Sequence, residues 1–162
     1  MLALLPVLTV ALMSVTPPCD APESAVMNFW TGDWDVTWDR GRGHDRVTRT
    51  PDGCEIEDDF DDGSGELPRT HSIWPSFGDG WAMDLLNGPF PDDYKPSPLI
   101  AFMGRPSGND YIFEESVGSA PMYYRIVFGD IRESSFTWRW QSAPDRKTWT
   151  DRLVAHYVRS NR

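Results

Sequence analysis

Histidines and carboxylates are the residues of this chain whose types could support catalysis or metal binding. The three histidines are His44, His71 and His156, and no two of them lie two or four residues apart, so no local pair could hold a metal ion. His71 and His156 fall on the outward-facing side of their expected strands. Because the sequence also contains neither a nucleophile elbow nor an HExxH motif, we predict no catalytic constellation, no metal site and no cofactor.

The most acidic stretch, residues 55–62, reads EIEDDFDD and is followed by Gly63 and Gly65. Clustered carboxylates beside a glycine turn are typical of calcium sites. The spacing nevertheless departs from the calcium loop, which needs a D-x-D-x-D pattern, then glycine, then a more distant acid. We interpret the run as a solvated hairpin end whose charges discourage pairing with another sheet edge.

Aromatic residues are the strongest candidates for a binding site. Seven of them are predicted to face the interior, where they would form apolar walls: Trp38, Trp81, Phe113, Tyr124, Trp138, Trp140 and Tyr157. Small-molecule sites have such walls with few polar groups. The same rings could instead fill the interior, because each buries about 150 to 250 Å². We expect a filled lower half and a modest cavity above it, which would bind a small apolar or aromatic molecule without catalysis.

Two other functions remain open. The first is a barrel enzyme of the isomerase or cyclase kind, in which an inward carboxylate such as Glu115 or Asp151 acts as the base. Burial would raise the pKa of that carboxyl group. The second is a solid barrel that binds another protein through a contiguous exposed apolar patch.

Short strands are the elements that must position these residues. Segments rich in Val, Ile, Thr, Tyr, Phe and Trp recur between turn signals, and no window after residue 32 sustains an apolar stripe at helical spacing. A helical turn is expected over residues 20–31. About nine or ten strands are expected, at residues 33–40, 44–50, 54–60, 68–75, 80–86, 98–103, 110–115, 122–130, 134–141 and 148–159.

The connections predict antiparallel neighbours. Hairpin turns are expected at residues 40–43, 61–65, 104–110 and 142–147, whereas the proline-rich segment 87–98 is expected to form a loop over one end. A flat sheet of this size would need helices to cover its apolar face, and almost none are predicted. We therefore predict an all-β fold, an antiparallel up-and-down β-barrel.

The stretch FWTGDWDVTW, residues 29–38, and the end of the last strand predict how the barrel closes. Trp34 and Trp38 alternate with polar residues and face inward, while Trp30 belongs to the helical turn before Gly32. Alternation in the last strand places five residues on one inward side, although Asp151 falls among them: Trp149, Leu153, Ala155, Tyr157 and Arg159. With an even number of strands, Arg159 lies near Trp34, where its guanidinium can stack on the indole and its donors can bind carbonyls.

Four short motifs are spread over the expected barrel. They are Phe29-Trp30-x-Gly32-Asp33-Trp34-Asp35-Val36, Gly53-Cys54-x-Ile56, Ser135-Phe136-Thr137-Trp138-Arg139-Trp140, and Trp149 before Tyr157-x-Arg159. Together they resemble a family of secreted bacterial lipocalin-like (calycin) domains of unknown function. The resemblance spans residues 29–159 and implies a calycin-type barrel closed by Gly32, Trp34 and Arg159. It implies no reaction.

The first sixteen residues, MLALLPVLTVALMSVT, are apolar apart from Ser and Thr and too short to span a bilayer as a helix. We interpret residues 1–19 as an export signal, cleaved between about residues 14 and 25. A single barrel domain at 20–162 would follow, in the periplasm or outside the cell; a buried N-terminal strand is the alternative. An exported chain can keep a disulfide between Cys19 and Cys54, unless cleavage removes Cys19.

The net charge of the chain limits which kinds of molecule it can bind. Lys and Arg number 15 and Asp and Glu 25, which gives a formal net charge of −10. The phosphate backbone of a nucleic acid would be repelled by such a surface. We expect no nucleic-acid partner, no membrane span after processing and a small apolar ligand. The oligomeric state stays open.

Overall fold

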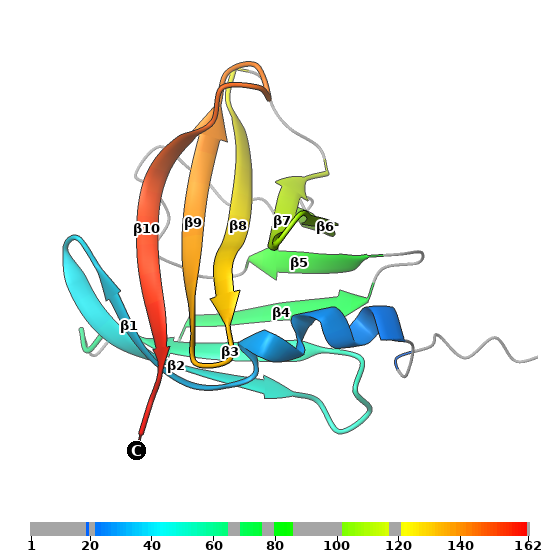
Figure 1. The fold of residues 1–162 in the computed structure, drawn as a ribbon, viewed down its shortest axis with the longest axis vertical. Coiled ribbons are helices and arrows are strands. Elements are labelled where there is room, and N and C mark those ends of the chain that lie inside the picture. The colour runs from blue at the N-terminus through cyan, green and yellow to red at the C-terminus, as the bar shows by residue number, and fades with distance from the viewer. Residues whose placement is uncertain are drawn as a thin grey trace, which may run out of the picture.

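Strands form almost all of the regular structure. The computed structural model describes Cys19 and residues 22–64, 69–75, 80–85, 102–116 and 121–161. Within this part of the chain one 3₁₀-helix precedes ten strands (Figure 1). The elements are η1 (Pro22–Trp30), β1 (Gly32–Trp38), β2 (Gly41–Arg49), β3 (Ile56–Asp61), β4 (Arg69–Pro75), β5 (Trp81–Leu85), β6 (Phe102–Ser107), β7 (Asp110–Glu115), β8 (Tyr123–Arg132), β9 (Ser135–Ala143) and β10 (Thr150–Arg159). The prediction of an all-β fold is confirmed.

The ten strands form a closed antiparallel barrel. Each strand pairs with the next one along the chain, and β1 pairs with both β2 and β10, which closes the ring. In Figure 1, β8, β9 and β10 stand upright whereas β3, β4 and β5 run across the view, because strands tilt and the sheet coils as a barrel closes. The predicted up-and-down order is therefore confirmed.

Alternation along the strands assigns one face of the sheet to the interior. In β3, buried and exposed residues alternate from Ile56 to Asp61. The largest fully buried side chains include six rings: Trp34, Trp81, Trp140, Phe102, Phe113 and Phe128. Rings from different strands meet edge-on, as Phe113 and Phe128 do with centroids 5.9 Å apart. The described interior is thus packed with aromatic side chains.

Helix η1 lies at the end of the barrel where β1 begins and β10 ends, which we call the helix end. Its Met27 and Trp30 are buried, and Phe29 packs edge-on against Phe136 with ring centroids 5.6 Å apart. Trp34 in β1 donates its indole N–H to the carbonyl of Trp30 at 2.7 Å. The predicted division, in which Trp30 is helical and Trp34 faces the core, matches this arrangement.

The barrel closes at the helix end through Arg159. The register of β1 and β10 sets Trp34 opposite Arg159, and the guanidinium carbon lies 4.0 Å from the centre of the indole ring. Its N–H groups donate, over 2.6 to 3.4 Å, to three backbone carbonyls, those of Phe29, Thr31 and Glu133. Gly32 has a φ of 130°, and a Cβ there would overlap the guanidinium. The three residues predicted to close the barrel therefore lie together.

A disulfide ties the start of η1 to the turn before β3. Cys19 and Cys54 are joined across 35 positions of sequence. Beside them, Arg49 donates to the carbonyl of Gly53 at 2.8 Å and to the side chain of Asn28 in η1. The pairing that the sequence left open is formed in the structure, and a loop of this length contributes about 3 to 4 kcal/mol on a chain-entropy basis.

The sixth strand differs from its predicted position. The sequence predicts a strand at residues 98–103 and a turn at 104–110, but β6 spans Phe102–Ser107 and Ser107 pairs with Asp110 across a tight turn. Pro106 lies within β6, opposite Tyr111 of β7. Among the described residues, β5 pairs only with the beginning of β6, at Phe102 and Met103. No described residue on that side therefore needs the N–H that Pro106 lacks.

A β-bulge in β10 changes which residues face inward. The register with β9 shifts between Asp151 and Leu153. The predicted inward and outward positions therefore hold from Leu153 to Arg159, whereas the residues before the bulge face the side opposite to the predicted one. Asp151 is exposed, and Trp149 packs its ring against Arg125, outside the core. The prediction that Trp149 shares the inward side of the last strand is therefore wrong.

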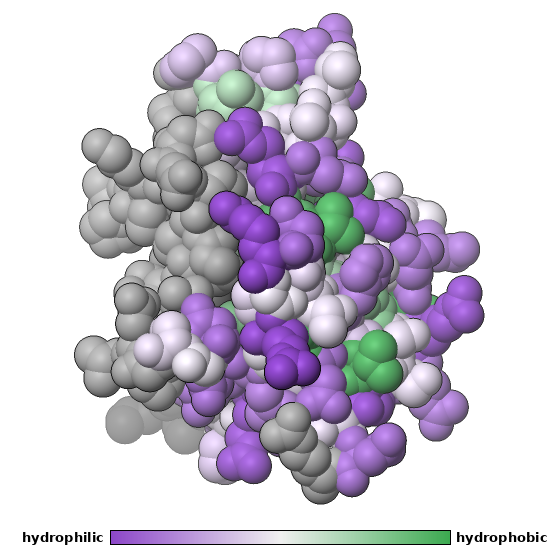
Figure 2. Space-filling model, turned by 90° about the vertical axis from the view of Figure 1, so that its left-hand side faces the viewer, coloured by the Kyte–Doolittle hydropathy of each residue, from purple (hydrophilic) through white to green (hydrophobic). Residues whose placement is uncertain are grey.

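The outer surface is mainly hydrophilic on the face shown in Figure 2, where apolar residues form separate islands. Among the described residues, the exposed large apolar side chains are Val26, Met103 and Val158, which belong to η1, β6 and β10. β6 and β10 are not neighbours in the barrel. The described surface therefore does not support the contiguous apolar patch that the protein-binding alternative requires.

Some predicted features fall outside the described residues. They are the export signal up to residue 18, the proline-rich loop 87–98 and the side chain of His71. In the described part of the chain, no helix is long and apolar enough to cross a membrane.

Candidate functional site

The aromatic residues predicted to form a pocket belong to one core. Five of them are buried: Trp81, Phe113, Tyr124, Trp140 and Tyr157. Trp38 and Trp138 are partly buried and pack against this core. Trp140 contacts rings on both sides, with centroids 5.9 Å from Tyr124 and 6.1 Å from Trp138. Within the described residues, these rings therefore act mainly as packing.

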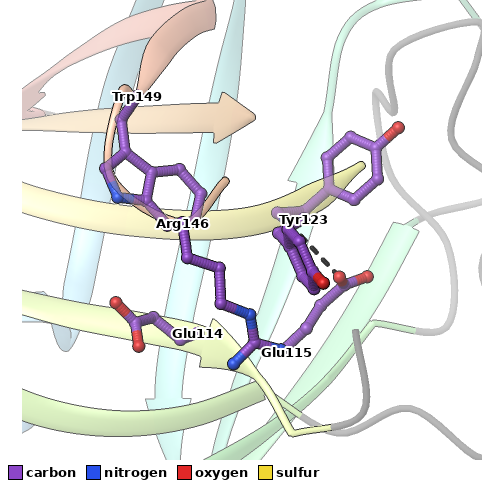
Figure 3. Close-up of a pocket in the computed structure, with 6 residues that line it drawn as sticks. Glu114, Glu115, Tyr123, Arg146 and Trp149 are labelled. Carbon is purple, nitrogen blue, oxygen red and sulfur yellow. Dashed lines mark hydrogen bonds between the residues drawn. The ribbon is translucent and has the colours of Figure 1, made fainter. Parts of the chain in front are cut away.

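A small hollow lies at the other end of the barrel, which we call the loop end. It is lined by six residues, which together define the rim hollow (Figure 3): Glu114, Glu115, Tyr123, Tyr124, Arg146 and Trp149. With these side chains in place its free volume is about 10 Å³, room for about one water molecule.

Two antiparallel strands position four of the six residues. β7 ends with the two glutamates, β8 begins with the two tyrosines, and their register pairs Glu114 with Arg125. Alternation buries Glu115 and Tyr124, whereas Glu114 and Tyr123 are half-buried. The rim hollow therefore lies where the core meets solvent.

Glu115 provides a buried carboxyl group in the rim hollow. It is 5% exposed, and the backbone N–H of Tyr124 donates to its Oε2 at 3.2 Å. Burial raises the pKa of Glu115, while the Tyr124 N–H and the positive charge of Arg146 offset part of that rise. Such a carboxyl group can hold a proton or bind a cation that enters the hollow.

A tight turn directs Arg146 toward the hollow from the loop between β9 and β10. Arg146 has a left-handed backbone, with φ of 56°. The next N–H groups, of Lys147 and Thr148, donate to Asp145 at 2.9 and 2.8 Å. An aspartate that accepts hydrogen bonds from the backbone N–H groups that follow it stabilises a turn without any strand partner.

The Arg146 side chain crosses the rim hollow. Its guanidinium carbon lies 4.3 Å from the centre of the Tyr123 ring. Figure 3 shows it pointing toward Glu115, whose pKa its charge lowers. Among the described residues, no hydrogen bond or ion pair within 4.0 Å holds this guanidinium. It is therefore held by ring contact and by electrostatic attraction, both of which a competing cation could replace.

Trp149 forms the outer wall of the hollow. The guanidinium carbon of Arg125 lies 4.2 Å from its ring centre, and Arg125 donates to Gln141 at 2.6 Å. Gln141 in turn donates to the exposed Asp151 at 2.6 Å. The prediction that Asp151 could act as an inward base is therefore wrong, because the bulge in β10 turns it outward. Glu115, the other predicted base, is buried.

Two buried aspartates were not predicted from the sequence. Asp45 in β2 is 0% exposed, and Asp58 in β3 is 4% exposed. Asp58 belongs to the acidic run 55–62, whose interpretation as a solvated hairpin end is wrong for this residue. It alternates with Ile56 and Phe60 on the buried side of β3, and this alternation is the signal that could have located it.

Asp45 interacts with the hydroxyl of Tyr157 inside the barrel. Burial raises the pKa of Asp45 to about 7, with a further rise from the charge of Asp59 and a reduction from the Tyr157 hydrogen bond. Neither Asp45 oxygen has a partner of good hydrogen-bond geometry among the described residues, so the contact with Tyr157 offsets only part of this rise in pKa. Burial, followed by the charges of Asp45 and Asp58, raises the pKa of Tyr157. This interior group can take up one proton near neutral pH.

The described histidine side chains lie away from the rim hollow. His44 is half-buried beside Asp33 and Asp35, with nitrogen–oxygen distances of 3.6 and 3.5 Å, and His156 is exposed, as its strand parity predicts. In the described ranges, no group of three His, Cys, Asp or Glu residues could hold a metal ion.

Comparison with known proteins does not assign the rim hollow. No model of a protein family matches this chain, and no curated protein matches its sequence. Its function is therefore inferred from the residues that line it and from the barrel that positions them.

Proposed function

We propose that this chain is an exported lipocalin-like barrel that binds a small molecule with an apolar or aromatic body at the rim hollow, without catalysis. The observation that carries this proposal is the group of rings around a buried carboxyl group at the mouth of the barrel. Tyr123, Tyr124 and Trp149 supply the rings, and Glu115 supplies the carboxyl. Aromatic walls with one or two polar groups are typical of small-molecule sites.

Two further observations support the lipocalin-like and exported parts of the proposal. Ten antiparallel strands close through Trp34 and Arg159, as the calycin resemblance implies. The apolar run of the first sixteen residues and the disulfide between Cys19 and Cys54 fit an exported chain, because disulfides persist in oxidising compartments.

Tryptophan fluorescence tests the binding proposal. The purified protein is titrated with a panel of small aromatic and apolar molecules, and a saturable change is expected for some of them. Trp149→Phe should remove most of that change, because Trp149 lines the hollow. Trp38→Phe is the matched control and should preserve it, because Trp38 packs on Phe60 outside the hollow. A response that survives Trp149→Phe unchanged would place the ligand elsewhere, and no saturable response would reject binding.

A second candidate function is a barrel enzyme that uses Glu115 as a base. The observation that favours it is the burial of Glu115, which raises the pKa of its carboxyl group toward the range useful for proton transfer. The test is exchange of α-protons of small ketones in D₂O, followed by NMR. Exchange that depends on protein and disappears in Glu115→Gln would support an enzyme, whereas exchange at the buffer rate would leave binding as the function.

A further inference from the structure

We propose that the ligand of the rim hollow is a small organic ammonium ion, and that Arg146 occupies the position of its positive charge in the free protein. This inference rests on the proposed binding function and names the chemical class of the ligand. It also assigns Arg146 a role, as a side chain that the ligand displaces.

Two rings of the rim hollow already lie against cations. Tyr123 is covered by the guanidinium of Arg146 at 4.3 Å, and Trp149 by that of Arg125 at 4.2 Å. The face of an aromatic ring carries partial negative charge and attracts an ammonium or guanidinium group. The face of Tyr123, which only Arg146 covers among these two cations, is therefore suited to the positive charge of a ligand with an apolar body.

The carboxylates of the hollow also favour a positively charged ligand. Glu114 pairs with Arg105 at 3.2 Å, whereas Glu115 is buried and accepts a hydrogen bond from the Tyr124 N–H. An anionic ligand would be repelled by Glu115, and a neutral ligand that displaced Arg146 would leave the buried carboxylate without the positive charge of that arginine. A cation gains from both the carboxylate and the rings. The formal net charge of −10 also favours the approach of cations to the protein.

The two guanidinium groups at this end differ in how firmly they are held. Arg125 donates to Gln141 at 2.6 Å, so its position over Trp149 is fixed. Arg146 is an exposed residue on a loop, and within the described residues it makes no hydrogen bond that would have to be broken. When its side chain swings away, the face of Tyr123 and the inner carboxyl of Glu115 become accessible together. The small free volume of about 10 Å³ is the space left while Arg146 is in place.

A matched pair of probes tests this inference. Phenethylamine is protonated at neutral pH, whereas phenethyl alcohol has the same aromatic body and no charge. Both are titrated into the unmodified protein and into three variants, Arg146→Gln, Glu115→Gln and Arg132→Gln. Arg132 is an exposed arginine at the helix end, so its substitution controls for the change in net charge. Thermal unfolding of each variant confirms that it is folded.

Phenethylamine is expected to bind about tenfold more tightly than phenethyl alcohol, which corresponds to about 1.4 kcal/mol. Arg146→Gln should raise the affinity for phenethylamine about two- to fivefold, the range of a partly exposed cation–ring contact. Arg132→Gln should change it less than twofold. Glu115→Gln should lower the affinity for the amine and leave that for the alcohol nearly unchanged.

The outcomes separate this inference from the function on which it rests. If the alcohol binds as tightly as the amine, both in the unmodified protein and in Arg146→Gln, the charge preference is wrong while binding at the rim hollow stands. If neither probe nor any molecule of the wider panel gives a saturable response, the binding function fails as well. Should Glu115→Gln fail to fold, the amine-to-alcohol ratio in Arg146→Gln still decides the inference.

Discussion

The two ends of the barrel use the same contact in different ways. At the helix end the guanidinium of Arg159 lies 4.0 Å from the ring centre of Trp34, and at the loop end that of Arg146 lies 4.3 Å from the ring centre of Tyr123. Arg159 also donates to backbone carbonyls from three separate residues, whereas the described contacts of Arg146 include no hydrogen bond. Stacking alone does not fix an arginine; the hydrogen bonds at its edge do.

The difference shows which end is structural and which end is free to bind. Loss of Arg159 would leave three carbonyls without this donor, and two of them, those of Phe29 and Thr31, lie in a partly buried setting where an unpaired carbonyl is costly. Loss of Arg146 exposes a ring face and a carboxyl group that a ligand could use. The helix end is therefore suited to closing the barrel, and the loop end to replacing the Arg146 side chain by a ligand.

The first prediction compares a ring at each end. Trp34→Ala should lower the free energy of unfolding by about 3 to 5 kcal/mol, because a fully buried ring is removed and a cavity remains. Trp149→Ala should cost about 1 kcal/mol or less, because Trp149 is only half-buried. Urea denaturation of both variants measures the two values. Equal costs would remove the distinction between the ends.

The second prediction concerns the disulfide at the helix end. Replacement of Cys19 and Cys54 by alanine should reduce the free energy of unfolding by about 3 to 4 kcal/mol, because the unfolded chain regains the freedom of a long loop. Guanidinium chloride denaturation measures the loss. A reducing agent should destabilise the unmodified protein by a similar amount and leave the double variant unaffected; a reductant that changes neither protein would show that this bond adds nothing.

The third prediction concerns the buried carboxyl group of Asp45. Asp45 lies in β2 and is the register partner of Trp34 in β1. The pKa of Asp45 is about 7 in the folded chain and about 3.9 in an unfolded one, so between these values the folded state binds more protons. The free energy of unfolding should therefore fall as the pH rises from about 4 to about 7, and level off above that. Asp45→Asn should remove most of this fall, on the order of 2 to 4 kcal/mol.

Urea denaturation at a series of pH values from 4 to 8 measures this slope. Glu115→Gln is the control from the loop end. The raised pKa of Glu115 also makes the free energy of unfolding fall as the pH rises. Glu115→Gln should therefore remove part of the total fall, but a smaller part than Asp45→Asn removes. A slope unchanged in Asp45→Asn would show that this carboxyl group titrates normally.

The smallest expected effect is the direct comparison of the two arginines. Arg159→Gln should lower the free energy of unfolding by about 1 to 2 kcal/mol, since charged donors to three carbonyls are lost. Arg146→Gln should stay within about 0.5 kcal/mol of the unmodified protein, as expected for an exposed position. Differential scanning calorimetry resolves such changes. A cost for Arg146→Gln as large as that for Arg159→Gln would mean that Arg146 is structural.

Much of the barrel could be predicted because alternation and turn residues are local signals. They located the strands that carry Trp34, Phe136 and Tyr157, and an even strand number placed Arg159 beside Trp34. The bulge at Asp151 could not be predicted, because one extra residue in a strand becomes visible only against its partner strand.

The candidate site was harder to predict from the sequence than the barrel. The rim hollow joins the ends of β7 and β8 to a loop that follows β9, and only the pairing of the strands brings these segments together. Glu115 was named from the sequence as a candidate inward carboxyl group, and in the structure it lies on the buried side of β7 with Phe113. Arg146 and Tyr123 gave no local signal, because an exposed loop arginine and a half-buried tyrosine are common on any surface.

The most direct test of the difference between the two ends is an NMR titration that follows the indole N–H signals of Trp149 and Trp34 as phenethylamine is added. Trp149 lines the rim hollow, whereas the Trp34 indole donates to the carbonyl of Trp30 beneath η1. The Trp149 signal should shift and saturate while the Trp34 signal stays in place. A shift of Trp34 with no shift of Trp149 would contradict the assignment of binding to the loop end.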